Sequence, residues 1–229
     1  EIIRWSVEIT NIFSTKFIYV SLNTMLLAIT AGVITTILAI LFNFNLRISK
    51  SKHSKIMNNF ISMGYGVPGL ILAIGITQFL TNFDLILSDT GIIVTGSLFG
   101  LIFAYVIKSY ALTNNVLESN YKQISTSIDE SARILGATKF NLLGNIHIPL
   151  LKTGIFTSVL LVISEVVKEL PATLILRPFN FDTLAVTVYT YASEERIYEA
   201  AFPALLIILI GLIPIYFISN MIRSSRSLN

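Results

Sequence analysis

The stretch Ser127-Ile-Asp-Glu-Ser-Ala-Arg-Ile-Leu-Gly136, which continues to Ile146-His-Ile-Pro149, is the polar centre of an otherwise apolar chain. It belongs to a segment, residues 114–148, whose charged and amide side chains are too costly to bury in hydrocarbon. The runs on either side are apolar and long. The sequence therefore predicts a compact helical segment held on one side of a membrane, where another protein can reach it.

The composition supports an integral membrane protein with a single domain over residues 1–229. Only 13% of the residues are charged and 54% are hydrophobic, whereas soluble domains have about 25% charged residues. The chain has no cysteine, which excludes disulfides and thiolate metal sites. Its net charge of +3 is explained by basic residues next to membrane spans. We therefore expect contact with membrane lipid and no binding of nucleic acid.

Five apolar segments are each long enough to cross a bilayer, which needs roughly 20 residues. The fold class is therefore predicted to be all-α, with spans at 17–45, 57–81, 91–111, 149–173 and 203–222. The second span contains Gly64-Tyr-Gly66-Val-Pro68-Gly69, where Pro68 removes a backbone donor and weakens the helix. This weak point is either a packing kink or a pliable stretch that lines a path through the membrane.

The distribution of basic residues predicts the orientation, because cytoplasmic loops of membrane proteins are rich in Lys and Arg. One side of the five spans holds Arg47, Lys50, Lys52, Lys55, Lys108, Lys122, Arg133, Lys139, Lys152, Arg223 and Arg226. The other side holds Arg4, Lys16, Arg177 and Arg196. We therefore expect the N-terminus outside, and the central segment and the C-terminus in the cytoplasm.

The central segment has the signals of two short helices. Ser127 and Glu130 fit a capping box, in which the serine hydroxyl and the glutamate satisfy backbone N–H groups at a helix start. A helix is predicted over 128–135, with Gly136 as its left-handed stop and a second helix over 139–145. We expect His147 to pack within this segment and His53 to be solvated. These helix signals also allow an alternative, which is a helical loop at the membrane interface that binds no partner protein.

The spacing of Glu130-Ser-Ala132, Gly136, Ile146 and Ile148-Pro149 resembles the signature of bacterial ABC importer permeases. That signature is Glu-Ala-Ala, three residues, Gly, nine residues, Ile, one residue, Leu, Pro. The chain departs from it only by Ser131 for Ala and Ile148 for Leu. By this resemblance the segment forms coupling helices that dock on a cytoplasmic ATPase. The expected coupling residues are Ser127, Glu130, Ala132, Gly136, Ile146 and Pro149.

The resemblance also implies the other components of the transporter. It predicts a five-span type I ABC importer permease core in the bacterial inner membrane, working with a second permease half or copy and a periplasmic substrate-binding protein. ATP and Mg would be bound by the partner ATPase, so this chain would hold no cofactor and would not be an enzyme. In keeping with this, the sequence has no G-x-x-x-x-G-K-[ST] phosphate loop.

A second resemblance concerns the cargo. The stretch Lys168-Glu-Leu-Pro-Ala-Thr-Leu-Ile-Leu-Arg-Pro-Phe-Asn-Phe-Asp-Thr-Leu-Ala185 looks like the permeases of ferric-iron ABC importers, which implies that this chain is the C-terminal half of such a permease. Thiamine, phosphate or phosphonate are alternative cargoes. The alternative from another class of protein is an ion-coupled secondary transporter. Such a transporter would have charged residues near the bilayer midplane, and the spans 17–45, 57–81, 91–111 and 203–222 have none there.

Two further groups of residues are functional candidates. Glu165, Lys168 and Glu169 share one face of the fourth predicted span, near its outer end. Together with Pro68 they are a hypothetical lining of the translocation path, and a neutralised structural pair is the alternative. Carboxylates suit hard cations, but no metal site is assigned. Glu194, Glu195 and Glu199 are a hypothetical acidic surface for docking of the binding protein.

Overall fold

The computed structural model of the protein describes residues 2, 4–5, 15–49, 52–91 and 93–226. Within these ranges every regular element is helical, so the predicted all-α class is confirmed. The elements are α2 (Thr15–Ser49), α3 (Lys52–Ser62), η1 (Met63–Gly66), α4 (Gly69–Ile86), η2 (Ser88–Thr90), α5 (Leu98–Gln123), α6 (Thr126–Ile134), α7 (Lys139–Asn141), η3 (Leu142–His147), α8 (Ile148–Val167), α9 (Pro171–Leu176), α10 (Leu184–Ser193) and α11 (Ile197–Arg226).

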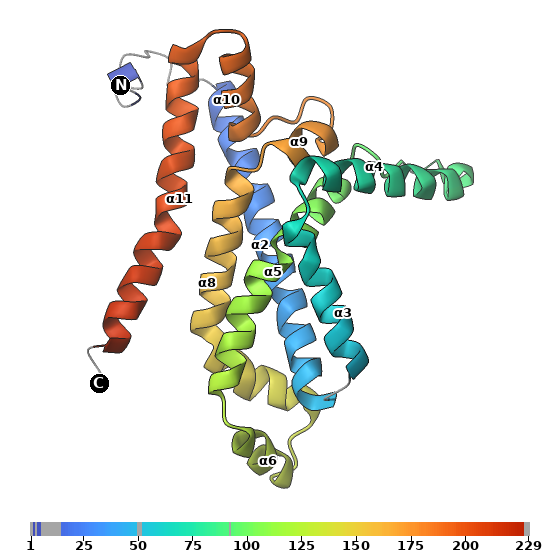
Figure 1. The fold of residues 1–229 in the computed structure, drawn as a ribbon, viewed down its shortest axis with the longest axis vertical. Coiled ribbons are helices and arrows are strands. Elements are labelled where there is room, and N and C mark those ends of the chain that lie inside the picture. Colours follow the sequence, from blue (N-terminus) through green and yellow to red (C-terminus); the bar gives the residue numbers. More distant parts are fainter. Residues whose placement is uncertain (1, 3, 6–14, 50–51, 92, 227–229) are drawn as a thin grey trace.

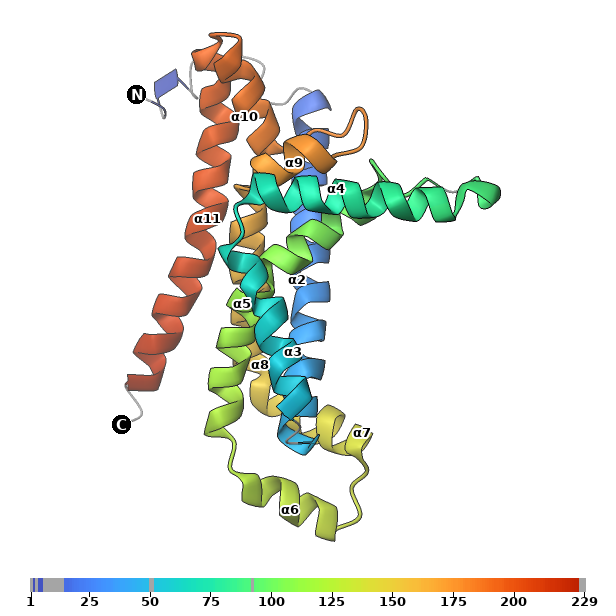
Figure 2. The ribbon, with the colours of Figure 1, turned by 45° about the vertical axis from the view of Figure 1, so that its right-hand side comes forward.

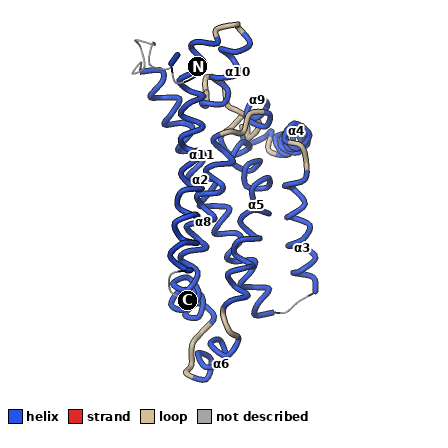
Figure 3. The backbone as a smooth tube through the Cα atoms, turned by 60° about the vertical axis from the view of Figure 1, so that its left-hand side comes forward, coloured by secondary structure: helices blue, strands red, loops and turns tan. Residues whose placement is uncertain are grey.

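Three long helices, α2, α5 and α8, pack against one another and form the centre of the bundle (Figure 1). The last helix, α11, lies against α8 and is joined to the bundle at one end by α10. At the opposite end the chain leaves the bundle and forms the short helix α6 (Figure 3). The predicted polar segment is therefore a protrusion at one end of a helical bundle.

Small side chains allow α2 to approach α8 and α5 closely. The buried face of α2 includes Ala28, Ala31, Gly32 and Thr35 at helical spacing. A Cβ atom on Gly32 would lie only 3.3 Å from the carbonyl oxygen of Val159. Lipid tails are as apolar as leucine, so membrane helices associate through such close packing more than through the hydrophobic effect.

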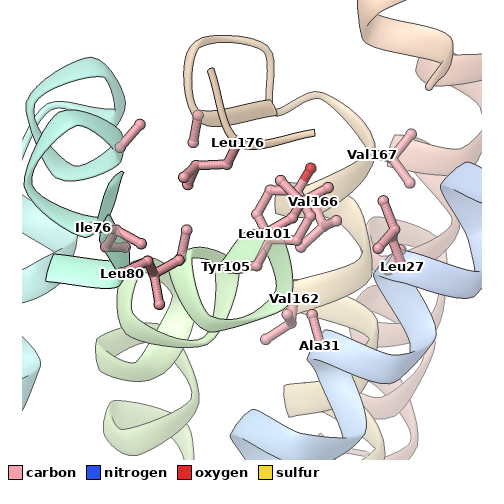
Figure 4. Close-up of a cluster of buried hydrophobic side chains, with 14 residues drawn as sticks. Leu27, Ala31, Ile76, Leu80, Leu101, Tyr105, Val162, Val166, Val167 and Leu176 are labelled. Atoms are coloured by element: carbon pink, nitrogen blue, oxygen red, sulfur yellow. The ribbon is translucent and has the colours of Figure 1, made fainter. Parts of the chain in front are cut away.

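The largest buried cluster joins five helices (Figure 4). Two of them, α4 and α9, lie toward the end of the bundle opposite α6 (Figure 1). It includes Leu27 of α2, Leu80 of α4, Leu101 of α5, Val162 of α8 and Leu176 of α9. The helices α4 and α9 therefore pack on the central helices and position the chain breaks that precede each of them.

The predicted second span, 57–81, is wrong as one continuous helix. The chain leaves the helical conformation at Val67 (φ −81°, ψ 126°) and Pro68 (φ −54°, ψ 134°) before α4 begins. An extended residue before proline is the sterically favoured conformation. As a result α4 runs crosswise to the bundle, as Figures 1 and 2 show. The weak point is thus a full break, not a kink.

Two other predicted boundaries are corrected. The helix α5 continues to Gln123, so residues 114–123 belong to the bundle and not to the protruding segment. The helical path into α8 begins at Lys139 and passes through the wider turns of η3, so the fourth span does not start at Pro149. Pro149 is the second residue of α8 and follows directly on these wider turns; because proline has no N–H, the helical path lacks one backbone hydrogen bond there.

The count of five spans is not reproduced. Among the described residues, four helices are long and apolar enough to cross a membrane: Thr15–Ser49, Gly69–Ile86, Lys139–Val167 and Ile197–Asn220. The second of these is the crosswise α4. The central helix α5 is not among them, because it carries Lys108 and several amide side chains among its apolar residues.

The contact between η1 and α5 provides a stability test. A Cβ on Gly64 would lie 2.8 Å from the carbonyl oxygen of Ile107, whereas a Cβ on Gly66 would meet nothing within 4 Å. We expect Gly64→Ala to destabilise the protein by about 1–3 kcal/mol through overpacking, and Gly66→Ala to have little effect. Thermal unfolding in detergent, followed by circular dichroism, measures both. Equal stability of the two variants would contradict the packing described for η1.

Candidate functional site

The helix α6 begins two residues earlier than the sequence predicted. Ser125, not Ser127, is the N-cap: its hydroxyl accepts a hydrogen bond from the N–H of Ser127 at 3.3 Å. Ser127 lies within the first turn, and its hydroxyl bonds that of Ser125 at 2.7 Å. The capping box of Ser127 and Glu130 is therefore wrong, although the predicted helix 128–135 overlaps most of α6.

The helix ends as predicted at Gly136. This glycine has φ +84°, a left-handed conformation that costs glycine little. Its N–H donates to the carbonyl of Arg133 at 3.0 Å, and the N–H of Ala137 donates to the carbonyl of Ala132 at 2.9 Å. These two bonds form a Schellman motif. They fix the angle at which the chain turns from α6 towards α7.

A buried ionic network, which the sequence did not reveal, connects α6 to the bundle. Arg47, at the end of α2, donates from Nε to Asp129 of α6 at 2.6 Å. Its terminal nitrogens donate to the carbonyls of Tyr121, Ile124 and Ser125, each at 2.9 Å. One guanidinium group thus holds the end of α5, the turn that follows it and α6 together. No local pattern could show this, because Arg47 and Asp129 are 82 residues apart.

His147 completes the network from the other side. It is fully buried, and its Nε2 lies 2.9 Å from Oδ1 of Asp129. The rings of Phe44 and Tyr121 pack edge-on against it, with centroids 5.3 and 5.5 Å away. The prediction that His147 packs within this segment is confirmed.

The proton positions follow from the charge of Asp129. Burial alone raises the pKa of this carboxyl, but the hydrogen bonds from Arg47 and His147 outweigh burial and hold the pKa below its ordinary value. The group is therefore a carboxylate at neutral pH and can only accept hydrogen bonds. Nε2 of His147 must then carry the hydrogen of the pair. The network is a fixed set of charge-assisted bonds.

The outer surface of this protrusion is unusually apolar. Ile134, Leu135 and Phe140 are 85%, 87% and 87% exposed. In contrast, Ala132 and Leu142 are buried in a small core between the protrusion and the bundle. Exposed clusters of large apolar side chains on a polar segment are typical of a protein–protein contact.

The predicted coupling residues therefore separate into two groups. Ala132 and Ile146 belong to the small core that supports the protrusion. The exposed ones are Ser127, Glu130, Gly136 and Pro149.

A second cluster of charges lies where α8 ends. Lys168 pairs with Glu165 at 2.8 Å, which is one of the pairings expected. The single face predicted for the three residues is wrong, because α8 ends at Val167 and Glu169 lies beyond it. Glu169 instead pairs with Lys108 of α5. Lys108, which the charge count grouped with the polar segment, therefore lies at the other end of α8 from that segment.

Glu169 connects both chain breaks. A Cβ on Gly69, next to Pro68, would lie 2.7 Å from Oε1 of Glu169, so the break before α4 touches this carboxylate. The same oxygen accepts a hydrogen bond from the N–H of Ala172 at 3.3 Å, in the first turn of α9. The structure thus places Gly69, the residue after Pro68, against Glu169, whereas the sequence grouped Pro68 and Glu169 only by hypothesis. The sequence did not indicate that Lys108 belongs to this cluster of charges.

The acidic residues proposed for docking are partly neutralised. Arg196 donates from one terminal nitrogen to Glu194 at 2.9 Å, and it donates from Nε and the other terminal nitrogen to Glu199. It also lies 4.7 Å from the ring centroid of Tyr191. Of the three carboxylates, only Glu195 lies outside this pairing. This surface is therefore mixed in charge, not acidic throughout.

Comparison with known proteins places the chain in a family. Residues 28–226 match the family described as "Binding-protein-dependent transport system inner membrane component". The match covers most of the chain, and the protein belongs to this family. The expectation of a permease component of an ABC importer, located in the inner membrane, is confirmed at this level.

Individual relatives are more distant. The chain is 27% identical over 157 residues to "Fe(3+)-transport system permease protein FbpB 2" of Haemophilus influenzae, covering 68% of this chain and 29% of that protein. It is 29% identical over 165 residues to "Probable transport system permease protein NifC" of Clostridium pasteurianum, covering 68% of this chain and 57% of that protein. The chain thus spans only a part of the length of both relatives.

A solved structure shares the fold. It is the crystal structure of a bacterial alginate ABC transporter in complex with an alginate pentasaccharide-bound periplasmic protein. The TM-score is 0.72 at 18% identity, and the match covers 90% of this chain and 79% of that one. At this identity the likeness supports the fold and nothing about the cargo.

The network around Asp129 predicts a pH dependence. Because folding lowers the pKa of Asp129, its ionised form stabilises α6 above the ordinary value of 3.8, and this contribution is lost as the pH falls through the lowered value. At neutral pH, Asp129→Asn should speed amide exchange of residues 126–134 at least about tenfold, because a hydrogen bond to a charged group contributes about 1.5–3 kcal/mol.

Hydrogen–deuterium exchange, corrected for intrinsic rates, measures this effect between pH 3 and 7. Glu130→Gln is the control, since Glu130 is exposed on the same helix and lies outside the network. The wild-type protein should approach the exchange of the variant only at the acidic end. Unchanged exchange in Asp129→Asn at pH 7 would show that the network does not hold α6.

Proposed function

We propose that the protein is the membrane-spanning component of an ATP-driven importer for ferric iron, with the protrusion in the cytoplasm and the N-terminus outside. A separate ATPase subunit binds ATP and Mg and docks on the protrusion. A periplasmic binding protein delivers the cargo at the opposite end, and a second permease half or copy completes the path. The family match and the shape and surface of the protrusion support this proposal.

The docking step rests on the exposed side chains of α6 and α7. Leu135 and Phe140 present apolar surface that the chain itself does not cover, and Glu130 adds a nearby carboxylate. An ATPase cleft lined by apolar and basic groups would bury this surface. Because Arg47 and Gly136 fix α6 from behind, movement of the ATPase is transmitted to α2, α5 and α8 instead of being absorbed in a loop.

The path rests on the cluster around Glu169. Broken helices inside a membrane protein are tolerated where they line a cavity or pack on protein, and charged residues at such places usually face the interior. Pro68 and Lys168 lie at two such breaks, next to the Lys108–Glu169 pair. Rearrangement of these breaks would open and close a path as the bundle changes shape.

The cargo assignment is supported by the name of the Haemophilus relative, which concerns Fe(3+), and by the carboxylates themselves. Carboxylate oxygens are ligands that hard cations prefer, and Glu165 is partly exposed beside the cluster. Glu165 and Glu169 would contact iron in transit. Glu194, Glu195 and Glu199 lie at the end where the binding protein would dock.

Docking is tested by Leu135→Glu combined with Phe140→Glu. We expect the pair to reduce co-purification of the ATPase at least about tenfold, because two apolar anchors of the contact would become charged. Phe179→Glu is a matched control, since Phe179 is 96% exposed on a segment remote from α6. Gly136→Asp should also lose the ATPase, because it strains the left-handed turn. Normal co-purification by the double variant would refute docking at this surface.

The path is tested by uptake of radiolabelled ferric iron in cells. Glu165→Gln combined with Glu169→Gln should lower uptake about tenfold or more while ATPase co-purification is kept. Asp89→Asn, an exposed acid beyond the end of α4, is the control. Unchanged iron uptake in the double variant would remove a direct role for these carboxylates. Uptake of phosphate, phosphonate or thiamine in place of iron would refute the cargo assignment.

A further inference from the structure

A cavity of about 520 Å³ opens beside the network of Arg47, between the end of α2, the first half of α3 and the last turns of α5. The end of α2, the start of α3 and the end of α5 lie at the same end of the bundle as α6 (Figure 2). Four basic side chains line it, namely Arg47, Lys52, Lys55 and Lys122, together with the carboxylate of Glu118. Neither the coupling segment nor the proposed path uses this cavity.

Two of the four positive charges are not neutralised. Arg47 is committed to Asp129, and Lys122 pairs with Glu118 at 2.7 Å. Lys52 and Lys55, one turn apart on α3, have no acidic partner in the part of the chain that the structure describes. The cavity therefore carries an excess of about two positive charges, and these belong to side chains free to bind an anion.

The cavity wall also supplies polar groups suited to oxygen atoms. Asn58 is 3% exposed, and its Oδ1 accepts the hydroxyl hydrogen of Tyr110. This fixes the amide, whose nitrogen has no partner within the described residues. The hydroxyl of Tyr121, another wall residue, is buried and equally without a partner there. A buried polar group without a partner is costly, so a ligand with acceptor oxygens would complete the bond that the Tyr121 hydroxyl lacks.

The surface next to the basic residues is apolar. Ile56, Phe60 and Met63 are 60%, 74% and 68% exposed. They follow the spacing of one helix face, directly beside the face that carries Lys52 and Lys55. A ligand that fits both faces has an anionic head and a long apolar part. That combination is the chemistry of a phospholipid, whereas free phosphate would use only the cavity.

We propose that this cavity binds the phosphate group of an anionic lipid, with the acyl chains lying along Ile56, Phe60 and Met63. Basic pockets between helices at a membrane surface attract such headgroups, with a contribution of about 1 kcal/mol for each basic residue. The bound lipid would hold α3 against α5, because Lys52 and Lys55 come from α3 while the unpartnered hydroxyl of Tyr121 comes from α5.

The test uses the full-length protein in detergent and fluorescent phosphatidylglycerol. Lys52→Gln combined with Lys55→Gln should weaken binding on the order of 30-fold, about fivefold for each lysine. Lys16→Gln combined with Lys152→Gln removes the same charge from exposed lysines elsewhere, and should bind as the unaltered protein does. Lys52→Arg combined with Lys55→Arg should keep binding, which separates loss of charge from loss of fold.

Two competitors identify the source of the phosphate group. Unlabelled phosphatidylglycerol should displace the probe, whereas phosphatidylcholine and inorganic phosphate at the same concentration should not. Displacement by inorganic phosphate as effective as that by the lipid would assign the cavity to a soluble anion and overturn the proposal. Equal binding by the Lys52/Lys55 and Lys16/Lys152 glutamine variants would overturn it as well.

Discussion

The guanidinium group of Arg47 is the group on which the position of α6 depends. A helix as short as α6 has little stability of its own, and its exposed face offers apolar groups that favour collapse or aggregation. Four hydrogen bonds from one side chain hold it in place, and they end on a carboxylate and three backbone carbonyls. The carboxylate is held in turn by His147. Without this arrangement the protrusion would be a loose loop.

The same physical problem recurs at the other end of the bundle, where charge must be buried next to hydrocarbon. There Lys108 and Glu169 neutralise each other across two helices. Glu169 also caps the start of α9, so one side chain satisfies both an ion pair and a backbone N–H group. The two ends of the bundle thus use the same device, a buried carboxylate that joins elements distant in sequence. At each end the carboxylate lies close to a chain break.

The local features of this protein were readable from its sequence, and the long-range ones were not. Gly136 predicted the end of α6 correctly, because that helix end depends on only a few residues and one backbone conformation. Pro68 correctly predicted a weak point in the helix. It did not predict the crosswise path of α4, because that path depends on packing against α9, which no local pattern contains. The N-cap predicted at Ser127 was wrong because Ser125, two residues earlier, has the same capping chemistry. The position predicted for Lys108 was wrong because its charge is paired with Glu169, a residue distant in the sequence.

The length of α8 has a consequence for how force can act in this molecule. Figure 2 shows that α7 runs crosswise to α8, so the straight part of this path is α8 alone. At about 1.5 Å per residue, its 20 residues form a rod of about 30 Å. One end of the rod lies beside the protrusion, and the other lies beside the ion pairs of Lys168 and Glu169. A tilt of about 5° about its first residue would move its last turn by roughly 3 Å, by lever geometry on that rod. That displacement is about the length of a hydrogen bond, so a small rotation at one end of α8 is enough to exchange bonding partners at the other.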